Sequence, residues 1–279
     1  MLLAGCDTHV HVIGDAMRYA MTQGRQYTPG TAVVADLQAH LKVQGLTRAV
    51  LIQPSVYGTD NQCMLDGLQV MQGNARGVAV LDTNTTTATL KNLDTQGVRG
   101  IRLNLESSNN HSATLLQDQL KAWAPRLADV GWHVQVYAPM AVTVACTKLI
   151  EKMPVPVVLD HFALWDDANC GSKESQTLLS LLEAGHIFIK LSASYRSPIK
   201  DAKSLNKLSN RLLTTRADRL LWASDWPHTN REPGRGPFEV SRYRNISATQ
   251  LLEERSHWLP TQDALQQVLV DNPAQLYRF

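Results

Sequence analysis

The sequence lacks the marks of a redox, nucleic-acid or membrane protein. Its four cysteines stand far apart, at positions 6, 63, 146 and 170, and no two form a CxxC pair, which argues against a zinc knuckle or a redox dithiol. The 27 basic and 25 acidic residues leave a net charge of +2 and are interspersed, so there is no basic footprint for nucleic acid. No apolar run approaches the roughly 20 residues of a membrane span.

The amino terminus also lacks a secretory signal. Residues 2–6 look like the cleavage box of a bacterial lipoprotein, but a signal needs a basic stretch and roughly 7–15 apolar residues before that box. The sequence has no room for either. We therefore expect a cytoplasmic protein with reduced thiols, and no membrane or nucleic-acid partner.

The chain does contain enough apolar residues for a sizeable core. Of its 279 residues, 44% are hydrophobic and 19% are charged, which suits one large domain or two smaller ones. No linker and no shift in composition divides the sequence. We therefore expect a single domain over residues 1–279.

Eight short apolar, β-branched segments recur along the whole chain. Their hydrophobicity is largely unalternated, which is typical of strands buried on both faces in a parallel sheet. The expected strands are residues 2–12, 48–55, 75–81, 98–105, 132–137, 156–162, 187–192 and 220–224.

Segments with helical periodicity separate these strands. Apolar residues recur at helical spacing in four sets: Val33, Leu37 and Leu41; Leu116, Leu120 and Ala124; Leu178, Leu181 and Leu182; Leu205, Leu208 and Leu212. Glycines at positions 45, 73, 97, 131 and 185 close helical stretches shortly before a strand. Eight strand–helix units predict an α/β fold, a (β/α)₈ TIM barrel. A doubly wound open sheet is the alternative, although it more often has fewer strands at this length.

Polar side chains stand at the carboxyl ends of most expected strands, where barrels build their active sites. In the first strand, Asp7, His9 and His11 alternate, so we expect all three to share one face. Longer irregular segments at 106–112, 165–173 and 228–245 follow strand ends and are expected to form the rim. The other polar residues at strand ends are Gln53, Ser55, Tyr57, Arg102, Asn104, Gln135, Tyr137, Asp160, His161, Lys190, Ser192, Ser194, Arg196, Ser224, Asp225 and His228.

This ordered set of motifs resembles the amidohydrolase superfamily. The HxH pair His9 and His11, the later His161 and the strand-eight Asp225 carry that resemblance. The lactonase branch, with the pyrone-dicarboxylate lactonases, is similar in residues 53–61, 97–104, 132–137, 224–228 and 272–277. The resemblance runs from residue 7 to residue 277, and it implies an amidohydrolase-type barrel that hydrolyses a lactone, a cyclic ester.

The resemblance also bears on metal binding. Superfamily members with two metals carry a bridging Lys or Glu on strand four and a His on strand five, but this chain has Arg102 and Tyr137 there, and arginine cannot coordinate a metal. The lactonase branch that shares the tyrosine works without metal, so no cofactor is expected. The alternative is one zinc ion held by His9, His11 and Asp225, because three N/O donors with an open position suit catalytic zinc.

Lactone hydrolysis needs an activated water and a stabilised oxyanion. By resemblance, Asp225 is the general base that takes a proton from water and later returns it to the leaving ring oxygen. His9, His11 and His161 polarise the substrate carbonyl. The neighbouring Asp7 is expected to orient imidazoles rather than to react. The remaining histidines divide by position: His40, His133 and His186 are expected to be structural or exposed, whereas His111 and His228 lie on rim loops.

Cationic and hydroxyl groups define the expected substrate. Arg102 and Arg196 are candidates to clamp a carboxylate with bidentate hydrogen bonds. After strand four the lactonases carry a further basic residue, whereas this chain has Glu106 followed by uncharged residues 107–110. A monoanionic or sugar-derived lactone is therefore as good a candidate as a dianionic pyrone, unless Arg231 or Arg235 supplies the charge. Further expected substrate-binding residues are Ser55, Tyr57, Tyr137 and His228.

Two other activities fit the same residues. A lactone isomerase would move a sugar-acid lactone between ring sizes and use the same histidines for proton transfer. A zinc-dependent decarboxylase would share the HxH pair, the later histidine and the strand-eight aspartate. The sequence leaves open whether the chain forms a homo-oligomer.

Overall fold

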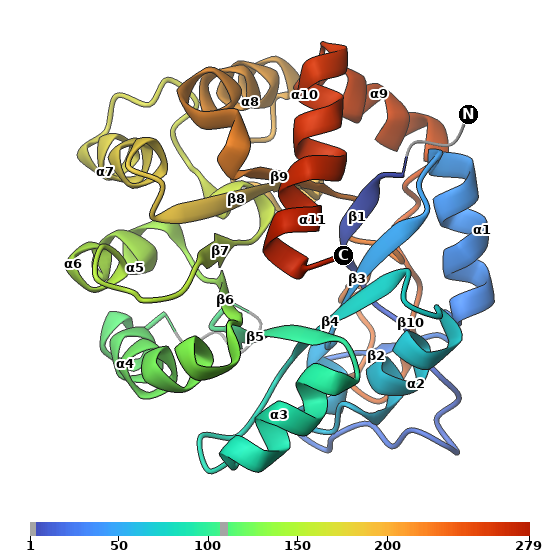
Figure 1. The fold of residues 1–279 in the computed structure, drawn as a ribbon. Helices are drawn as coiled ribbons and strands as arrows, with labels where there is room; N and C mark the ends of the chain where they lie inside the picture. The colour runs from blue at the N-terminus through green and yellow to red at the C-terminus, as the bar shows by residue number, and fades with distance from the viewer. Residues whose placement is uncertain (1–3, 107–110) are drawn as a thin grey trace.

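Eight parallel strands form a ring in this computed structural model, which describes residues 4–106 and 111–279 (Figure 1). Their order around the ring follows the chain. The strands are β1 (Cys6–Val10), β3 (Arg48–Ile52), β4 (Ala75–Ala79), β5 (Val98–Asn104), β6 (His133–Tyr137), β7 (Val157–Leu159), β8 (Ile187–Ser192) and β9 (Leu220–Ala223).

The ring closes where the last strand returns to the first. The Asp225 N–H donates to the His9 carbonyl at 3.1 Å, and the His11 N–H donates to the Trp226 carbonyl at 2.8 Å. An open sheet would leave these edge groups without partners. The predicted TIM barrel is therefore confirmed, and the doubly wound alternative is wrong.

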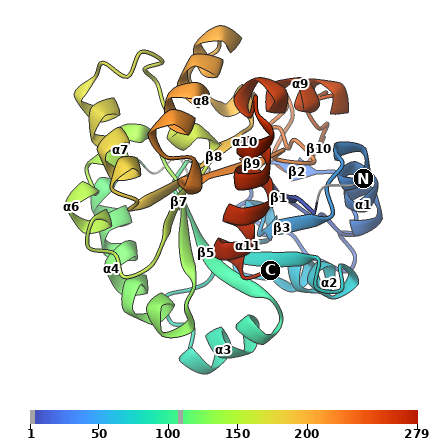
Figure 2. The same ribbon diagram turned by 45° about the horizontal axis from the view of Figure 1, so that its top comes forward.

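Helices surround the strands on the outside of the barrel, and the last helix lies across the end where the strands begin (Figures 1 and 2). They are α1 (Val34–Gln44), α2 (Gln62–Val70), α3 (Thr87–Thr95), α4 (Ala113–Val130), α5 (Met140–Val144), α6 (Thr147–Ile150), α7 (Lys173–Glu183), α8 (Ala202–Arg216), α9 (Ala248–Trp258), α10 (Gln262–Gln266) and α11 (Asn272–Tyr277). All five predicted helix-closing glycines have a positive φ, between 65° and 97°. Only glycine adopts that conformation freely, which explains its place between each helix and the next strand.

Two of the predicted helical faces differ in detail. Val33 precedes α1 as its N-cap and is 44% exposed, so it is not part of the buried stripe of that helix. In α4 the buried face continues through Trp123 and Leu127 instead of Ala124. The large Trp123 side chain covers the surface that the sequence pattern assigned to its neighbour.

An apolar plug fills the barrel interior at the end where the strands begin. Tyr277 of α11 is fully buried there, and in Figure 1 this helix lies in front of the strand ring. The chain end stays at the same place, because Phe279 stacks under the guanidinium groups of Arg48 and Arg76. The side chains packed with Tyr277 are Cys6, Val50, Ile52, Val78, Val158, Phe188 and Leu221. A water-accessible site is therefore left to the opposite end, where the strands finish.

A small second sheet joins two distant segments at that opposite end. Strand β2 (Thr28–Pro29), between β1 and α1, pairs in parallel with β10 (Val240–Ser241), between β9 and α9. The Thr28 hydroxyl adds a hydrogen bond to the Pro237 carbonyl at 2.7 Å. The segment 228–245 is therefore partly ordered as a strand, rather than wholly irregular as expected.

No helix in the described part of the chain is both long and apolar enough to cross a membrane. Residues 2 and 3 of the first expected strand, and residues 107–110 of an expected rim loop, lie outside the described residues.

Candidate active site

A polar cavity of about 200 Å³ opens at the carboxyl ends of the strands. It is lined by His11, Tyr27, Pro54, Ser55, Arg102, Glu106, Tyr137, His161, Arg196, Asp225, Thr229, Asn230, Arg231 and Arg244. Seven residues predicted from strand ends are thus brought together, on segments far apart in the sequence. The volume suits a small single-ring molecule rather than a polymer.

Three predicted site residues do not line this cavity. His9 is fully buried behind it. Tyr57 is also buried, and its hydroxyl accepts a hydrogen bond from the Gly14 N–H at 3.1 Å, so it supports the β1–α1 segment instead. The ring of His228 lies against Tyr195, whose hydroxyl is 3.4 Å from its Nδ1. The segment 165–173, expected on the rim, also contributes nothing to the cavity.

Asp7 does not share a face with His9 and His11, so that prediction is wrong. The pairing of β1 with β3 shifts register between Asp7 and Val10, and such an irregularity breaks strict alternation of side chains. The Asp7 Oδ1 accepts the backbone N–H groups of Ser224 (3.0 Å) and His9 (3.3 Å). Its Oδ2 lies 3.5 Å from Nε2 of His40 in α1. Asp7 therefore holds β1 to β9 and faces the helix layer.

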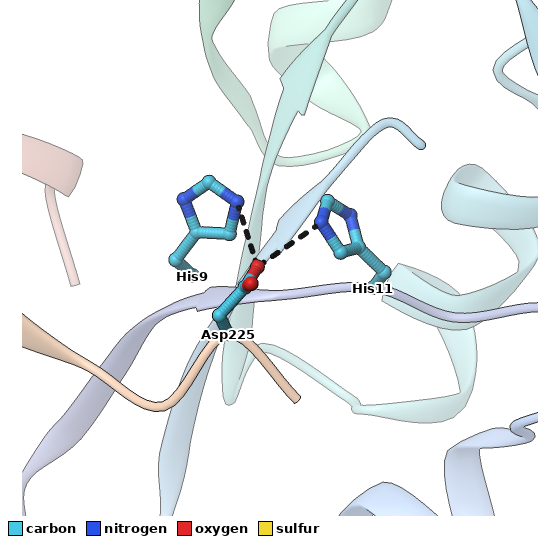
Figure 3. A group of neighbouring side chains, drawn as sticks. All are labelled: His9, His11 and Asp225. Carbon is cyan, nitrogen blue, oxygen red and sulfur yellow. Dashed lines mark ion pairs between the residues drawn. The ribbon is translucent and has the colours of Figure 1, made fainter. Parts of the chain in front are cut away.

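The centre of the site is formed by two imidazoles that face one carboxylate oxygen (Figure 3). Nε2 of His9 and Nε2 of His11 each lie 3.6 Å from Oδ1 of Asp225. The His11 Nδ1 donates to the Ile52 carbonyl at 2.8 Å, so a neutral His11 presents an Nε2 lone pair to this oxygen. His9 does the same when its Nδ1–H donates to Asp160 Oδ1 at 3.2 Å. With the ring protons of both histidines on Nδ1, three acceptor atoms converge on one point, although the Lys190 ammonium also lies 3.3 Å from His9 Nδ1.

This convergence leaves buried acceptors to be satisfied. Among the described residues, neither His9 Nε2 nor Asp225 Oδ1 has a hydrogen-bond partner. Buried polar atoms of this kind are costly unless something donates to them. A water with two protons, a shared proton or a metal ion would each satisfy the arrangement.

Asp225 is held as an anion by its second oxygen. The Arg196 Nε–H donates to Oδ2 at 2.6 Å, and the Tyr195 hydroxyl donates to the same atom at 2.8 Å. Burial alone would raise the pKa of the Asp225 carboxyl, but Arg196 and His161 hold that pKa well below its usual range. Burial raises the pKa of Tyr195, so its hydroxyl keeps the proton that it donates. Oδ1 is the oxygen left for chemistry.

A second carboxylate lies beneath the imidazoles, in a fully buried charged network. Asp160 Oδ2 accepts from Arg102 Nε and from Gln135 Nε2, both at 3.1 Å. The Lys190 ammonium lies 3.5 Å from Asp160 Oδ1 and donates to Gln135 Oε1 at 2.7 Å. Burial would raise the pKa of Asp160, but His9, Lys190 and Arg102 hold that pKa well below its usual range. This network fixes the orientation of His9.

His161 differs from the other two imidazoles in the hydrogen-bond partner of its Nδ1. That atom lies 2.9 Å from the Ser192 hydroxyl, which is able to donate. Burial lowers the His161 pKa to about 3, so the ring is neutral at ordinary pH, and its proton stands on Nε2 when the Ser192 hydroxyl donates to Nδ1. His161 and Asp225 both have left-handed backbone, with φ of 49° and 60°. Such conformations cluster at functional sites.

The donor set for a metal is present, but its surroundings are cationic. His9, His11 and Asp225 place three ligating atoms within 4.8 Å of one another, as do His9, Asp160 and His161. Nitrogen and oxygen donors of this kind suit a divalent ion. The two buried carboxylates, however, already face three cations: Lys190, Arg102 and Arg196. The donor geometry fits a metal, whereas the net positive charge favours an anionic ligand.

Sequence patterns missed several residues that line the cavity or contact its residues. Tyr195 stands between two predicted strand-end residues, so the strand-end rule pointed at its position without selecting it. Tyr27 and Arg244 follow no barrel strand directly and reach the cavity from the segments joined by β2 and β10. No local signal in the sequence marks them, because their placement depends on that pairing.

Comparisons with known proteins agree with the fold. The family model described as Amidohydrolase matches residues 6–279. The 2-pyrone-4,6-dicarboxylate hydrolase of Comamonas testosteroni is 31% identical over 97% of this chain and 89% of its own length. The 4-sulfomuconolactone hydrolase of Hydrogenophaga intermedia is 26% identical over 97% of this chain and 88% of its own length.

A solved structure has the same fold as this chain. The crystal structure of a probable 2-pyrone-4,6-dicarboxylic acid hydrolase from Acinetobacter baumannii, with citric acid bound, superposes with a TM-score of 0.83 and 28% identity. The match covers 99% of this chain and 100% of that one. On its sequence, its barrel and these relatives, the chain belongs to the amidohydrolase family.

Proposed function

We propose that the protein hydrolyses a carboxylate-bearing lactone, with Asp225 as the general base. One observation carries this assignment: Asp225 Oδ2 is fully engaged, while Oδ1 is unpaired in the described structure and faces two imidazole nitrogens. A carboxylate held in this way is ready to orient a water and to accept its proton. The two curated relatives described above are hydrolases of lactone substrates by name, which supports the same reaction class.

The nucleophile in this mechanism is a water at the point where the acceptors converge. Its two protons are donated to Asp225 Oδ1 and to an imidazole Nε2 of His9 or His11. As the water oxygen attacks the lactone carbonyl carbon, its proton passes to Asp225. His9 and His11 thus act as acceptors that position the water, a role that differs from the expected one of donors to the carbonyl.

The carbonyl oxygen becomes an oxyanion and needs donors. His161 Nε2–H is the donor assigned by its tautomer, and the Arg102 guanidinium lines the same cavity. The tetrahedral intermediate then collapses, the ring C–O bond breaks, and Asp225 returns its proton to the leaving oxygen. One water is consumed, and the products are a carboxylic acid and a hydroxyl group, or its keto tautomer, on one open chain.

We propose further that this reaction needs no metal. The cations around Asp160 and Asp225 supply positive charge without one, and Arg196 already neutralises the only carboxylate of the first donor set. A mononuclear zinc enzyme is the second candidate, favoured by the unpaired His9 Nε2 and Asp225 Oδ1. His9, His11 and Asp225 would hold that ion, which would supply Lewis-acid polarisation of the carbonyl.

The test is a panel of pyrone, muconolactone, aldonolactone and aldarolactone substrates, followed by NMR with and without chelator. Hydrolysis gives an open acid, whereas an isomerase gives a new lactone. Metal analysis of the same preparation decides the cofactor: one tightly bound zinc that is needed for turnover would refute the metal-free mechanism.

The variant Asp225→Asn tests the base directly. We expect a loss of kcat of about 100- to 10,000-fold, which is the contribution that general-base catalysis typically makes. Circular dichroism should show an unchanged fold. The matched control is Asp218→Asn, a half-exposed carboxylate paired with Arg216 on the outside of the barrel, which should keep full activity. Near-normal turnover by Asp225→Asn would remove Asp225 from this role.

A further inference from the structure

Arg244 is a cavity-lining arginine that the mechanism above does not use. It follows β10 in the segment between β9 and α9, and its backbone N–H donates to the His228 carbonyl at 2.9 Å. Its guanidinium lies over the ring of Tyr195, 5.0 Å from the centroid. The residue thus reaches the cavity from the rim, beside the general base.

Its bonding differs from that of the two arginines selected from the sequence. Arg102 and Arg196 direct their Nε–H groups at the buried carboxylates Asp160 and Asp225. Arg244 makes no ion pair with any residue that the structure describes, and its Nε is buried without a hydrogen-bond partner there. A buried cationic donor without a partner is costly, and an anion from the cavity would remove that cost.

The position of Arg244 is fixed before any ligand arrives. Tyr195, on which it stacks, is anchored by its hydrogen bond to Asp225. The preceding Tyr243 donates its hydroxyl to the Gly30 carbonyl, and β10 pairs with β2. Little conformational entropy is therefore lost when the guanidinium binds a ligand.

The opposite side of the rim carries negative charge. Glu106 follows β5, lines the cavity and lies 3.3 Å from Nε2 of His111. A lactone with an acidic substituent is repelled from Glu106 and attracted to Arg244. Beside these two residues, the acidic end of a substrate is therefore favoured at Arg244 and disfavoured at Glu106.

We propose that Arg244 forms a second anion subsite, which binds an acidic group of the lactone remote from its reacting carbonyl. The ligand chemistry is a carboxylate or sulfonate on a small planar ring. The inference rests on the proposed lactone hydrolysis for the identity of the substrate, and on the cavity alone for the binding of the anion.

Binding of an inert anion tests the subsite without catalysis. Isophthalate carries two ring carboxylates and benzoate carries one, and neither can be hydrolysed. Titration calorimetry should show that Arg244→Met weakens isophthalate binding about 10- to 100-fold, down to the affinity of benzoate. Arg244→Lys should restore part of the affinity. The control Arg242→Met removes an exposed arginine two residues away, paired with Glu232, and should leave both affinities unchanged.

Kinetics with matched lactones complete the test. Arg244→Met should raise KM for a dianionic lactone by the same factor at unchanged kcat, and should leave a monoanionic lactone unaffected. Equal isophthalate affinity in the wild type and in Arg244→Met would overturn the subsite, as would an equal loss for benzoate. If isophthalate binding depends on Arg244 but no lactone is turned over, the subsite stands and the hydrolase assignment falls.

Discussion

Replacing Arg196 by methionine should move the acid limb of the pH–activity profile. The sequence places Arg196 at the substrate, but in the structure its Nε–H donates to Asp225 Oδ2 at 2.6 Å, and its Nη2 holds the Thr229 carbonyl at 3.2 Å. Methionine keeps the apolar stem and removes the charge. Asp225, which is 1% exposed, then loses the cation that offsets its burial.

The size of the effect follows from that one contact. A hydrogen bond between charged groups contributes about 1.5–3 kcal/mol, and one pKa unit corresponds to about 1.4 kcal/mol. The loss should therefore raise the pKa of Asp225 by about one to two units. The proposed base acts as the carboxylate, so activity should begin to fall at a pH about one to two units higher than in the wild type.

The assay is the pH dependence of kcat/KM, which reports the ionisation of the free enzyme. Arg242→Met serves as the control and should leave the profile in place. Tyr195→Phe removes the other donor to Oδ2 and should shift the limb in the same direction by a smaller amount. An acid limb at the same pH in Arg196→Met and in the wild type would refute the reasoning, whatever happens to KM.

Two further predictions concern stability. Burial lowers the pKa of His133 and of His161 to about 3, so below pH 6.5 the unfolded chain binds protons that the native protein does not. The free energy of unfolding should therefore fall between pH 6.5 and 3, by about 1.4 kcal/mol per pH unit for each histidine. The variant His133→Phe loses the contribution of one histidine, so its free energy of unfolding, measured with urea, should fall less steeply with decreasing pH. An unchanged pH dependence would contradict this. Gly100→Ala places a Cβ 2.4 Å from His133 Cε1 and should lower the free energy of unfolding by about 1–3 kcal/mol. That loss should shrink in a His133→Ala background, and full additivity would argue against the clash.

The barrel could be predicted because the strands are buried on both faces at most positions and appear in the sequence as largely apolar, β-branched runs. The predicted ends of the strands were less accurate. The expected end of the second strand, at residue 55, falls inside the 3-10 turn Ser55–Tyr57. The expected strand 156–162 stops at Leu159, because the chain turns left-handed from His161 to Leu164. Such turns place catalytic side chains, and hydrophobicity does not encode them.

The sequence predicts which residues form the site better than it predicts which contacts they make. His11, His161 and Asp225 meet as expected, since carboxyl ends of barrel strands share one mouth. The outward position of Asp7 could not be foreseen, because it depends on a register shift and on backbone donors of β9. The pairing of Arg196 with the base likewise depends on tertiary geometry.

The two-residue pairing of β2 with β10 places proposed substrate-binding residues on other segments than the proposed reacting residues. Arg244 and Tyr27 lie on the segments that this pairing joins, whereas His161 and Asp225 directly follow barrel strands. We therefore expect a change in the length or charge of residues 230–245, beyond the Thr229 that Arg196 contacts, to alter the recognised acid and to leave the proton-transfer residues in place. In evolution, and in an engineering experiment, we expect that this segment can be exchanged to change the substrate without changing the reacting residues.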